Sequence, residues 1–240
     1  MRILLLGYGK MGKAIEKIAL ERGHEIVGRI NEFNRHEITT KADVAIEFSQ
    51  PEGAFENIRF CLENNIPIVC GTTGWLDKKT EIEKLTQSCN GTFFYASNFS
   101  IGVNIFFQLS DKLATMMNGQ PQYDVGIDEI HHTEKKDAPS GTAITLADGI
   151  IKNFHSKKKW ISKTMSTEPE KMKHDDLLIT SFRIDQVPGT HHVKYASSID
   201  DIEIRHTAHS REGFARGAVQ VAEWLPGRKG VLGMQDFLQF

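Results

Sequence analysis

The sequence lacks the features that mark secreted, membrane-spanning or nucleic-acid-binding proteins. It has only three cysteines, Cys61, Cys70 and Cys89, and their spacing suits neither a metal nor a disulfide framework. No apolar run reaches the roughly 18 residues that a membrane span requires. Lysine plus arginine (29) and aspartate plus glutamate (31) nearly balance, so no basic stripe favours nucleic acid. With no signal peptide, these absences predict a cytoplasmic protein that has reduced thiols and no metal, membrane or nucleic-acid partner.

The composition is that of an ordinary globular enzyme. Hydrophobic residues make up 40% of the 240 residues and charged residues 25%. A chain of this length can form one large domain or two of moderate size, with a buried core in each.

A glycine motif near the start of the chain predicts a nucleotide site. The apolar run Arg2 to Leu6 suits a buried parallel strand, and a helical pattern follows the motif. Between them the spacing is G-x-G-x-x-G, in which the glycines permit a tight turn, close approach of a pyrophosphate and close helix packing. The motif alone is weak, but its place between a strand and a helix predicts that a dinucleotide binds residues Gly7, Tyr8, Gly9, Lys10, Met11 and Gly12.

The residues after the second predicted strand, His24 to Ile30, bear on the choice of cofactor. An acidic residue about 20 positions after the glycines usually binds the adenine ribose of NAD. In this chain Asn31 or Glu32 could bind that ribose, whereas Arg29 or Arg35 could pair with the 2′-phosphate of NADP. The sequence therefore leaves both NADH and NADPH open.

Two more loops follow predicted parallel strands, at the edge where open α/β sheets bind ligands. The strand Ile66 to Cys70 runs into Gly71-Thr72-Thr73-Gly74, and the strand Thr92 to Ala96 runs into Ser97-Asn98-Phe99. Either loop could be a plain connection between elements. Their position nevertheless favours a place beside the cofactor.

The most informative stretch runs from Glu129 to Ala143. His131, His132, Lys135 and Lys136 can hold up to four positive charges within six residues. Like charges this close repel and cost stability unless an anion, a substrate or an ion pair compensates. Pro139-Ser140-Gly141-Thr142 then opens an apolar run, as a helix does whose first N–H groups lack intrahelical partners. Ser140 or Thr142 could be a simple helix cap. The combination predicts a site for a carboxylate or a phosphate.

The pattern changes after about residue 100. A helix at 101–117 and a strand at 124–131 precede the helix that follows Thr142, and strands are expected at 177–186, 191–196 and 201–206. Lys157-Lys158-Lys159 is interpreted as a solvated loop, and helices at 212–224 and 231–238 return the chain to the first domain. The predicted fold class is α/β. It combines a Rossmann-type dinucleotide-binding domain (1–100 and 209–240) with an α+β substrate-binding and oligomerisation domain (101–208) that has an open mixed sheet.

Six segments together resemble those of a known family, dihydrodipicolinate reductase of the lysine and diaminopimelate pathway. They are residues 7–12, 71–74, 96–104, 129–143, 187–191 and 208–218, which span nearly the whole chain. The histidine-lysine segment with its Asp137-Ala-Pro-Ser-Gly-Thr-Ala143 ending is the most specific of them. The resemblance implies reduction of the cyclic imine formed when 4-hydroxy-tetrahydrodipicolinate loses water, with hydride from NADH or NADPH.

The resemblance also implies roles for individual residues. His131 would be the general acid/base, and Lys135 the proton donor or the charge stabiliser. Four residues would hold the substrate carboxylates, namely His132, Ser140, Gly141 and Thr142. Beyond the glycine turn, the cofactor would meet Gly71, Thr72, Thr73, Ser97, Asn98 and Phe99. Asn31 and Glu32 are candidates from their spacing alone, since this region departs from the acidic-plus-arginine pair of some family members.

Two other classes of protein share part of this pattern. Another two-domain NAD(P)-dependent dehydrogenase acting on a small carboxylate would not need His-His-x-x-Lys before Ser-Gly-Thr, and a non-catalytic dinucleotide sensor would not need a proton donor. As for partners, an open sheet has edges that natural proteins usually cover. The resemblance suggests a homotetramer that assembles through the second domain.

Overall fold

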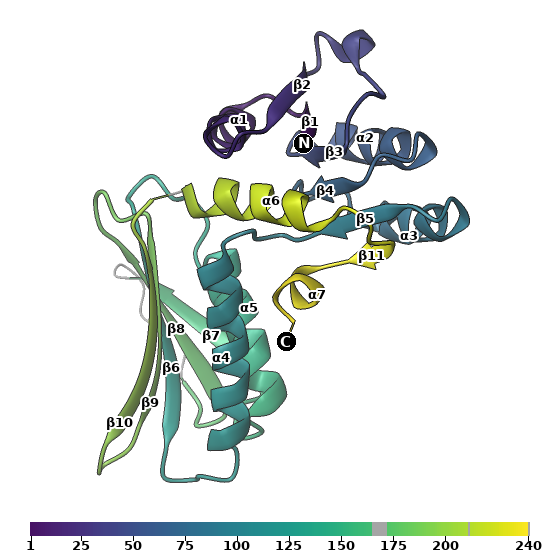
Figure 1. Ribbon diagram of the computed structural model, residues 1–240. Helices are drawn as coiled ribbons and strands as arrows, with labels where there is room; N and C mark the ends of the chain where they lie inside the picture. Colours follow the sequence, from purple (N-terminus) through teal and green to yellow (C-terminus); the bar gives the residue numbers. More distant parts are fainter. Residues whose placement is uncertain (165–171, 211, 240) are drawn as a thin grey trace. The chain divides into compact units, whose positions relative to one another are not determined.

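The chain folds into two compact units, shown in Figure 1. The computed structural model describes residues 1–164, 172–210 and 212–239. Unit 1 consists of Met1–Ile101 and Glu212–Phe240, and unit 2 of Gly102–Arg211. Within the described residues, no helix is both long enough and apolar enough to cross a membrane.

Unit 1 is built on a six-stranded sheet in which every neighbouring pair is parallel. The strand order is β11-β5-β4-β3-β1-β2. The strands are β1 (Arg2–Leu6), β2 (Glu25–Ile30), β3 (Val44–Glu47), β4 (Ile68–Cys70), β5 (Thr92–Tyr95) and β11 (Gly230–Leu232). The helices are α1 (Lys10–Glu21), α2 (Pro51–Glu63), α3 (Lys79–Ser88), α6 (Glu212–Trp224) and α7 (Met234–Leu238).

Unit 1 has three layers, with helices on both faces of its sheet. The alternation of side chains along β1 explains this arrangement. Ile3 and Leu5 pack into one core with α1 and α6, whereas Leu4 and Leu6 pack into a second core with α2 and α3. Successive side chains of a strand point to opposite faces, so a strand that is apolar throughout needs helices on both sides. The apolar run Arg2 to Leu6 is such a strand.

Unit 2 has a five-stranded mixed sheet in the order β10-β9-β6-β8-β7. Its strands are β6 (Asp124–His131), β7 (Lys159–Thr164), β8 (Asp176–Arg183), β9 (Gly189–Ala196) and β10 (Asp201–Ala208). Pairs β10–β9 and β9–β6 are antiparallel, and β6–β8 and β8–β7 are parallel. Helices α4 (Ile101–Met117) and α5 (Gly141–Asn153) lie on one face of this sheet (Figure 1). Their apolar side chains form the core of unit 2 together with those of the strands.

The inward rows of β6 and β9 are apolar along most of their length and carry polar residues at one end. On β6 the inward residues Val125 and Ile127 belong to the core, and the next residue of the same row is Glu129. Strand β9 carries Val193 in the core, and His191 precedes it in the same row. Because these strands are neighbours, their polar ends meet at one place, which becomes the site described below.

The structure confirms the α/β fold class and most of the predicted elements, and it corrects three of them. Residues 231–238, predicted as one helix, form strand β11 followed by the short helix α7. Lys159, predicted as part of a solvated loop, is the first residue of strand β7. Lys157 is buried rather than solvated, because its ammonium group donates to the carbonyls of His174 and Asp176 and pairs with Asp124 at 2.6 Å.

Gly217 in α6 offers a test of the packing in unit 1. A Cβ at this position would lie 1.8 Å from the carbonyl oxygen of Phe99, so Gly217→Ala must push the helix away. We expect a loss of about 1–3 kcal/mol in unfolding free energy. Gly213→Ala in the same helix is the matched control, since its Cβ would meet only Ser100 Oγ at 3.7 Å. Urea denaturation in which both variants lose equal stability would contradict the packing described here.

Candidate active site

Strand register brings the polar residues of unit 2 together. Glu129 on β6 is opposite His191 on β9 and beside Ser181 on β8, and His131 is beside Arg183. The N-terminus of α5 adds Ser140, whose backbone N–H donates to Glu129 Oε2 at 2.9 Å. The site is therefore held by three neighbouring strands and one helix end.

Glu129 is a fully buried carboxylate. Besides the N–H of Ser140, it accepts a hydrogen bond at Oε1 from the guanidinium of Arg183, 3.2 Å away. Burial alone would raise the pKa of Glu129, but the hydrogen bonds from Ser140 and Arg183 outweigh it and hold the pKa below its ordinary value. Glu129 is thus a buried, ionised group.

His131 lies beside this carboxylate, with its Nε2 atom 3.7 Å from Glu129 Oε2. Its other ring nitrogen, Nδ1, donates to the carbonyl oxygen of Pro188 at 3.2 Å. Its ring also lies over Gly189, where a Cβ would come within 2.9 Å of the ring. Burial lowers the pKa of His131, Glu129 opposes this shift, and Lys135 adds to it.

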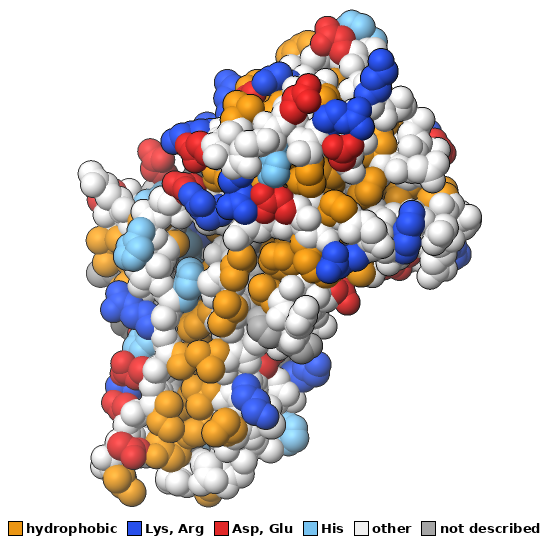
Figure 2. Space-filling model, viewed as in Figure 1, with side chains coloured by type: hydrophobic (Ala, Val, Ile, Leu, Met, Phe, Trp, Pro, Cys, Tyr) orange, Lys and Arg blue, Asp and Glu red, His pale blue; other side chains and the backbone are white. Residues whose placement is uncertain are grey.

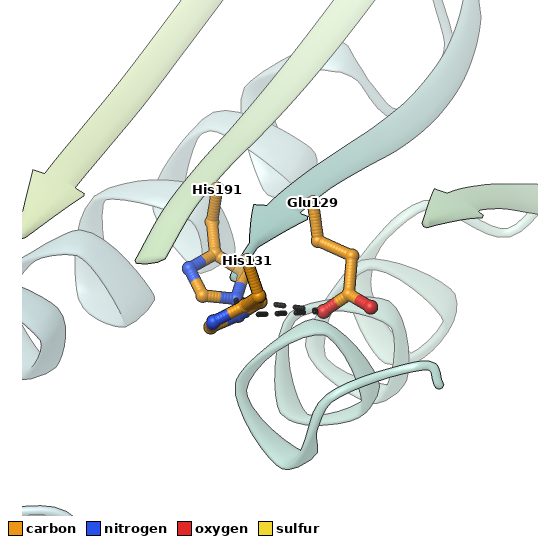
Figure 3. A group of neighbouring side chains, drawn as sticks. All are labelled: Glu129, His131 and His191. Atoms are coloured by element: carbon orange, nitrogen blue, oxygen red, sulfur yellow. Dashed lines mark hydrogen bonds and ion pairs between the residues drawn. The ribbon is translucent and has the colours of Figure 1, made fainter. Parts of the chain in front are cut away.

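His191 completes a cluster with these two side chains (Figure 3). Its Nε2 atom is 3.4 Å from His131 Nε2 and 3.0 Å from Ser140 Oγ. Burial lowers the pKa of His191 to about 3, with a further lowering from His131. At neutral pH the ring of His191 is therefore uncharged.

The three side chains could also be considered as a metal site, because one ligand atom from each lies within 4.8 Å of the others. The surrounding charges argue against it. Arg183 already pairs with Glu129, and Lys135 adds positive charge close to His131. We therefore interpret the group as a hydrogen-bonded cluster.

The loop after β6 presents Lys135. Its ammonium group is held by Asp137, with both carboxylate oxygens at 2.7 Å. Arg183 braces this loop from β8 by donating to the carbonyls of Asp137 at 2.7 Å and Lys135 at 3.3 Å. The same guanidinium thus joins the loop to buried Glu129.

Helix α5 begins next to this loop. Ser140 is its N-cap: the buried hydroxyl accepts the N–H of Ala143 at 3.2 Å and contacts His191. Gly141 is exposed, and a Cβ there would meet nothing within 4 Å. The first N–H groups of the helix, at Gly141 and Thr142, have no carbonyl four residues back to bind and can face an anion.

The structure brings together part of the predicted set and adds residues to which the sequence motifs assign no role. His131, Lys135, Ser140, Gly141 and Thr142 lie around the end of β6, and adjacent His132 is half-buried just past the strand. The added residues are Glu129, Arg183 and His191. Alternation could have found them, because each lies where an inward row that begins or ends with apolar residues becomes polar.

The predicted glycine turn of unit 1 lines a pocket of about 680 Å³. A Cβ on Gly7 would lie 2.1 Å from the carbonyl oxygen of Phe48, and one on Gly12 would lie 2.3 Å from that of Gly7. Gly9 differs from both, because a Cβ there would have no neighbour within 4 Å. Two of the glycines therefore permit the turn itself, and the third leaves open space where a pyrophosphate can approach.

The residues after β2 line the same pocket. Asn31 builds the turn, because its side-chain carbonyl accepts the N–H groups of Phe33 and Asn34 at 2.8 and 3.2 Å. Glu32 and Arg35 both line the pocket, and Arg35 donates to Asn57 Oδ1 at 2.9 Å. Arg29 instead pairs with Glu16, which also accepts the hydroxyl of Tyr8.

The loops after β4 and β5, which are also predicted to contact the cofactor, use most of their side chains for packing and hydrogen bonds within unit 1. Thr72 Oγ1 accepts the N–H of Ser49 at 2.8 Å, and a Cβ on Gly71 would lie 2.2 Å from the ring of Phe48. Phe99 is buried against Phe48, with ring centroids 5.4 Å apart. For a ligand, these loops offer backbone groups and the exposed side chains of Thr73 and Ser97. On α1, Lys10 is exposed and Met11 packs against the core.

Comparisons with known proteins match both halves of the chain. A family model described as "Dihydrodipicolinate reductase, N-terminus" matches residues 1–99, and "Dihydrodipicolinate reductase, C-terminus" matches residues 102–238. The 4-hydroxy-tetrahydrodipicolinate reductase of Christiangramia forsetii is 48% identical over 240 residues, which cover 99% of this chain and 98% of that protein. The protein of the same name from Campylobacter jejuni is 36% identical over 237 residues, 96% of this chain and 95% of its own.

A solved structure shares the fold. Dipicolinate-bound dihydrodipicolinate reductase from a Paenisporosarcina species has a TM-score of 0.79 at 22% identity, and the match covers 99% of each chain.

The uncharged ring of His191 predicts a specific sensitivity to acid. Its folded pKa of about 3 lies below the ordinary 6.5, so the unfolded state binds more protons between these values and stability falls as the pH falls through them. Between pH 7.5 and pH 5 this residue alone should remove about 2 kcal/mol of unfolding free energy. Urea denaturation at both pH values should show a smaller loss in His191→Gln. Equal losses in the variant and the wild type would mean that His191 is not held neutral.

Proposed function

The chain belongs to the dihydrodipicolinate reductase family, and we infer that it is an NAD(P)H-dependent 4-hydroxy-tetrahydrodipicolinate reductase. The reaction reduces the dehydrated cyclic imine of that substrate to tetrahydrodipicolinate, a step of lysine and diaminopimelate biosynthesis. The observation that carries this conclusion is that both family models match and that named relatives align over nearly the whole chain.

We propose that the pocket of unit 1 binds NADH or NADPH. Open space at Gly9, the close packing that only glycine allows at positions 7 and 12, and the pocket volume all suit a dinucleotide. Glu32 would accept the ribose hydroxyls, and Arg35 would face a 2′-phosphate. The bound nicotinamide would supply the hydride.

We propose that the N-terminus of α5 anchors the substrate through its carboxylates. Backbone N–H groups at Gly141 and Thr142, with the Thr142 hydroxyl and His132, provide donors where the helix dipole favours negative charge. Ser140 would support the helix end instead of binding the substrate directly, because its hydroxyl already accepts the N–H of Ala143 and contacts His191. A dicarboxylate suits such an arrangement.

His131 and Lys135 are the proposed proton-handling groups. An imidazole can exchange protons near neutral pH, and a lysine can donate a proton or stabilise negative charge that develops on the reacting ring. Asp137 pairs with the ammonium group of Lys135 at 2.7 Å and holds it in place on the loop that leads to the helix end. The two groups therefore have distinct tasks.

Replacing these two groups tests the proposed function. His131→Gln and Lys135→Met should each lower kcat by about 10²–10⁴ in NADPH oxidation with freshly generated substrate, because each removes an acid–base group. Lys136→Met is the matched control, since exposed Lys136 has no proposed role. Fluorescence titration with NADPH should show unchanged cofactor binding in all three. Turnover within threefold of wild type for both His131→Gln and Lys135→Met would contradict the assignment.

The residues of the cofactor pocket predict that the enzyme uses both NADH and NADPH. Glu32 favours a ribose diol and repels a 2′-phosphate, whereas Arg35 favours that phosphate, so kcat/KM for NADH and NADPH should agree within about 100-fold. Arg35→Met should lower kcat/KM with NADPH by about tenfold or more, since a hydrogen bond to a charged group is worth about 1.5–3 kcal/mol. Its effect with NADH should be small. Arg29→Met, outside the pocket, serves as the control, and an equal loss with both cofactors would count against this role of Arg35.

We propose that unit 1 is the dinucleotide-binding domain and that unit 2 is the substrate-binding and oligomerisation domain. Helices α4 and α5 cover one face of the unit 2 sheet, and most residues of the opposite face are partly buried or exposed. Natural proteins usually cover such faces and edges. We therefore expect a homotetramer joined through this sheet. Light scattering should give the mass of four chains, and a stable monomer at micromolar concentration would refute the assembly.

We also propose that the protein works in the cytoplasm. All three cysteines are free, and two of them, Cys61 and Cys70, are buried in the core of unit 1. Unpaired thiols of this kind are typical of a reducing compartment.

A further inference from the structure

His191 has no part in the reaction proposed above, yet it lies at the centre of the site. With 4% of its surface exposed, its ring is too deep to touch a substrate. A buried imidazole needs partners for its polar atoms. Those partners are the N-cap of α5, the proposed general acid/base and the buried carboxylate.

The contacts of one atom, His191 Nε2, join these three groups. It lies 3.0 Å from Ser140 Oγ, 3.4 Å from His131 Nε2 and 3.8 Å from Glu129 Oε2. Figure 3 shows both histidine rings turned toward the carboxylate of Glu129. The ring of His131 is thus bounded by His191, Glu129 and Gly189.

Hydrogen positions in the neutral cluster follow from the partners. The carbonyl oxygen of Pro188 can only accept, so the proton of neutral His131 is on Nδ1 and its Nε2 carries a lone pair. Two lone pairs facing each other at 3.4 Å would repel. A proton on His191 Nε2 avoids this repulsion, and both Ser140 Oγ at 3.0 Å and His131 Nε2 at 3.4 Å can accept it.

We propose that His191 is a positioning residue for His131: the buried imidazole fixes the ring of His131 and, with Glu129 beside it, supplies a matching partner for both of its charge states. Against neutral His131 it presents an N–H. When His131 takes up one proton on Nε2, the new N–H is directed to Glu129, and the N–H of His191 is accepted by Ser140 Oγ, 3.0 Å away. Glu129 Oε2, 3.7 Å away, balances the new positive charge. This inference rests on the proposed role of His131.

The charged groups around His131 determine the direction in which its pKa changes when one of them is replaced. Glu129 favours the imidazolium, whereas Lys135 and Arg183 disfavour it. On the far side, His191 is also faced by His206 of β10. Glu129→Gln removes the favourable charge while keeping a polar side chain of the same shape. It should lower the pKa of His131 by about one unit or more.

A matched pair of variants separates hydrogen bonding from packing. His191→Gln places an amide near the position of Nε2, whereas His191→Met has a similar length and no donor. We expect His191→Met to lower kcat tenfold or more with cofactor KM unchanged, and His191→Gln to stay within about threefold of wild type. The pH profile of kcat should have one limb that is lost in His131→Gln and therefore reports the ionisation of His131. In Glu129→Gln this limb should move to lower pH.

NMR of histidine-labelled protein tests the proposal without turnover, so a failure of the proposed reaction remains distinguishable from a failure of this inference. The neutral ring of His131 should be the Nδ1–H tautomer in wild type and in His191→Gln, and a mixture of tautomers in His191→Met. The pKa of His131 should fall in Glu129→Gln. Equal behaviour of the Gln and Met variants in both kinetics and tautomer, or an unchanged pKa in Glu129→Gln, would overturn the proposal and leave His191 as packing.

Discussion

The burial of an ionised carboxylate at Glu129 is the constraint on which the rest of the site depends. A buried charge is costly unless hydrogen bonds and an opposite charge compensate for it. Here the compensation comes from the N-terminus of α5 and from Arg183 of β8. By satisfying one carboxylate, the fold fixes the helix end that can bind an anion, the loop that carries Lys135 and the strand that carries His131.

The candidate site of unit 1 depends on close contacts between backbone segments at the glycine turn, and not on a buried charge. At Gly7 and Gly12 any side chain would collide with a carbonyl oxygen, whereas Gly9 faces open space. The same three-glycine pattern therefore builds the turn and leaves it accessible. Each unit thus presents the N-terminus of a helix, at α1 and at α5, to a candidate anion.

Local pattern in the sequence is sufficient for most of the fold. The apolar run before the glycines, the helical periodicity of 101–117 and the alternation of 124–131 correspond to β1, α4 and β6. Local pattern is insufficient where an element is short or polar. Strand β11 has only three residues, and the lysines of β7 suggest a solvent-exposed loop. The expectation for Lys157 is wrong because its acceptors are distant in sequence: the carbonyls of His174 and Asp176, and Asp124.

The site is predictable only in part. The segment 131–142 is contiguous, so its residue types by themselves indicate an anion site. Glu129, Arg183 and His191 meet only through the register of three strands, and two of these strands follow the first by about 50 residues or more. Pairing of this kind is not visible in local sequence, although a polar residue in an apolar row marks where it occurs.

The most direct test of this account is the ionisation of Glu129 itself. Carbon-13 NMR of glutamate-labelled protein, with the signal assigned by its loss in Glu129→Gln, follows that one carboxyl group during a pH titration. The carboxylate of Glu129 should stay ionised from neutral pH to below 4.5, its ordinary pKa. A Glu129 carboxyl that takes up a proton above pH 4.5 would show that the site is not built around a buried charge.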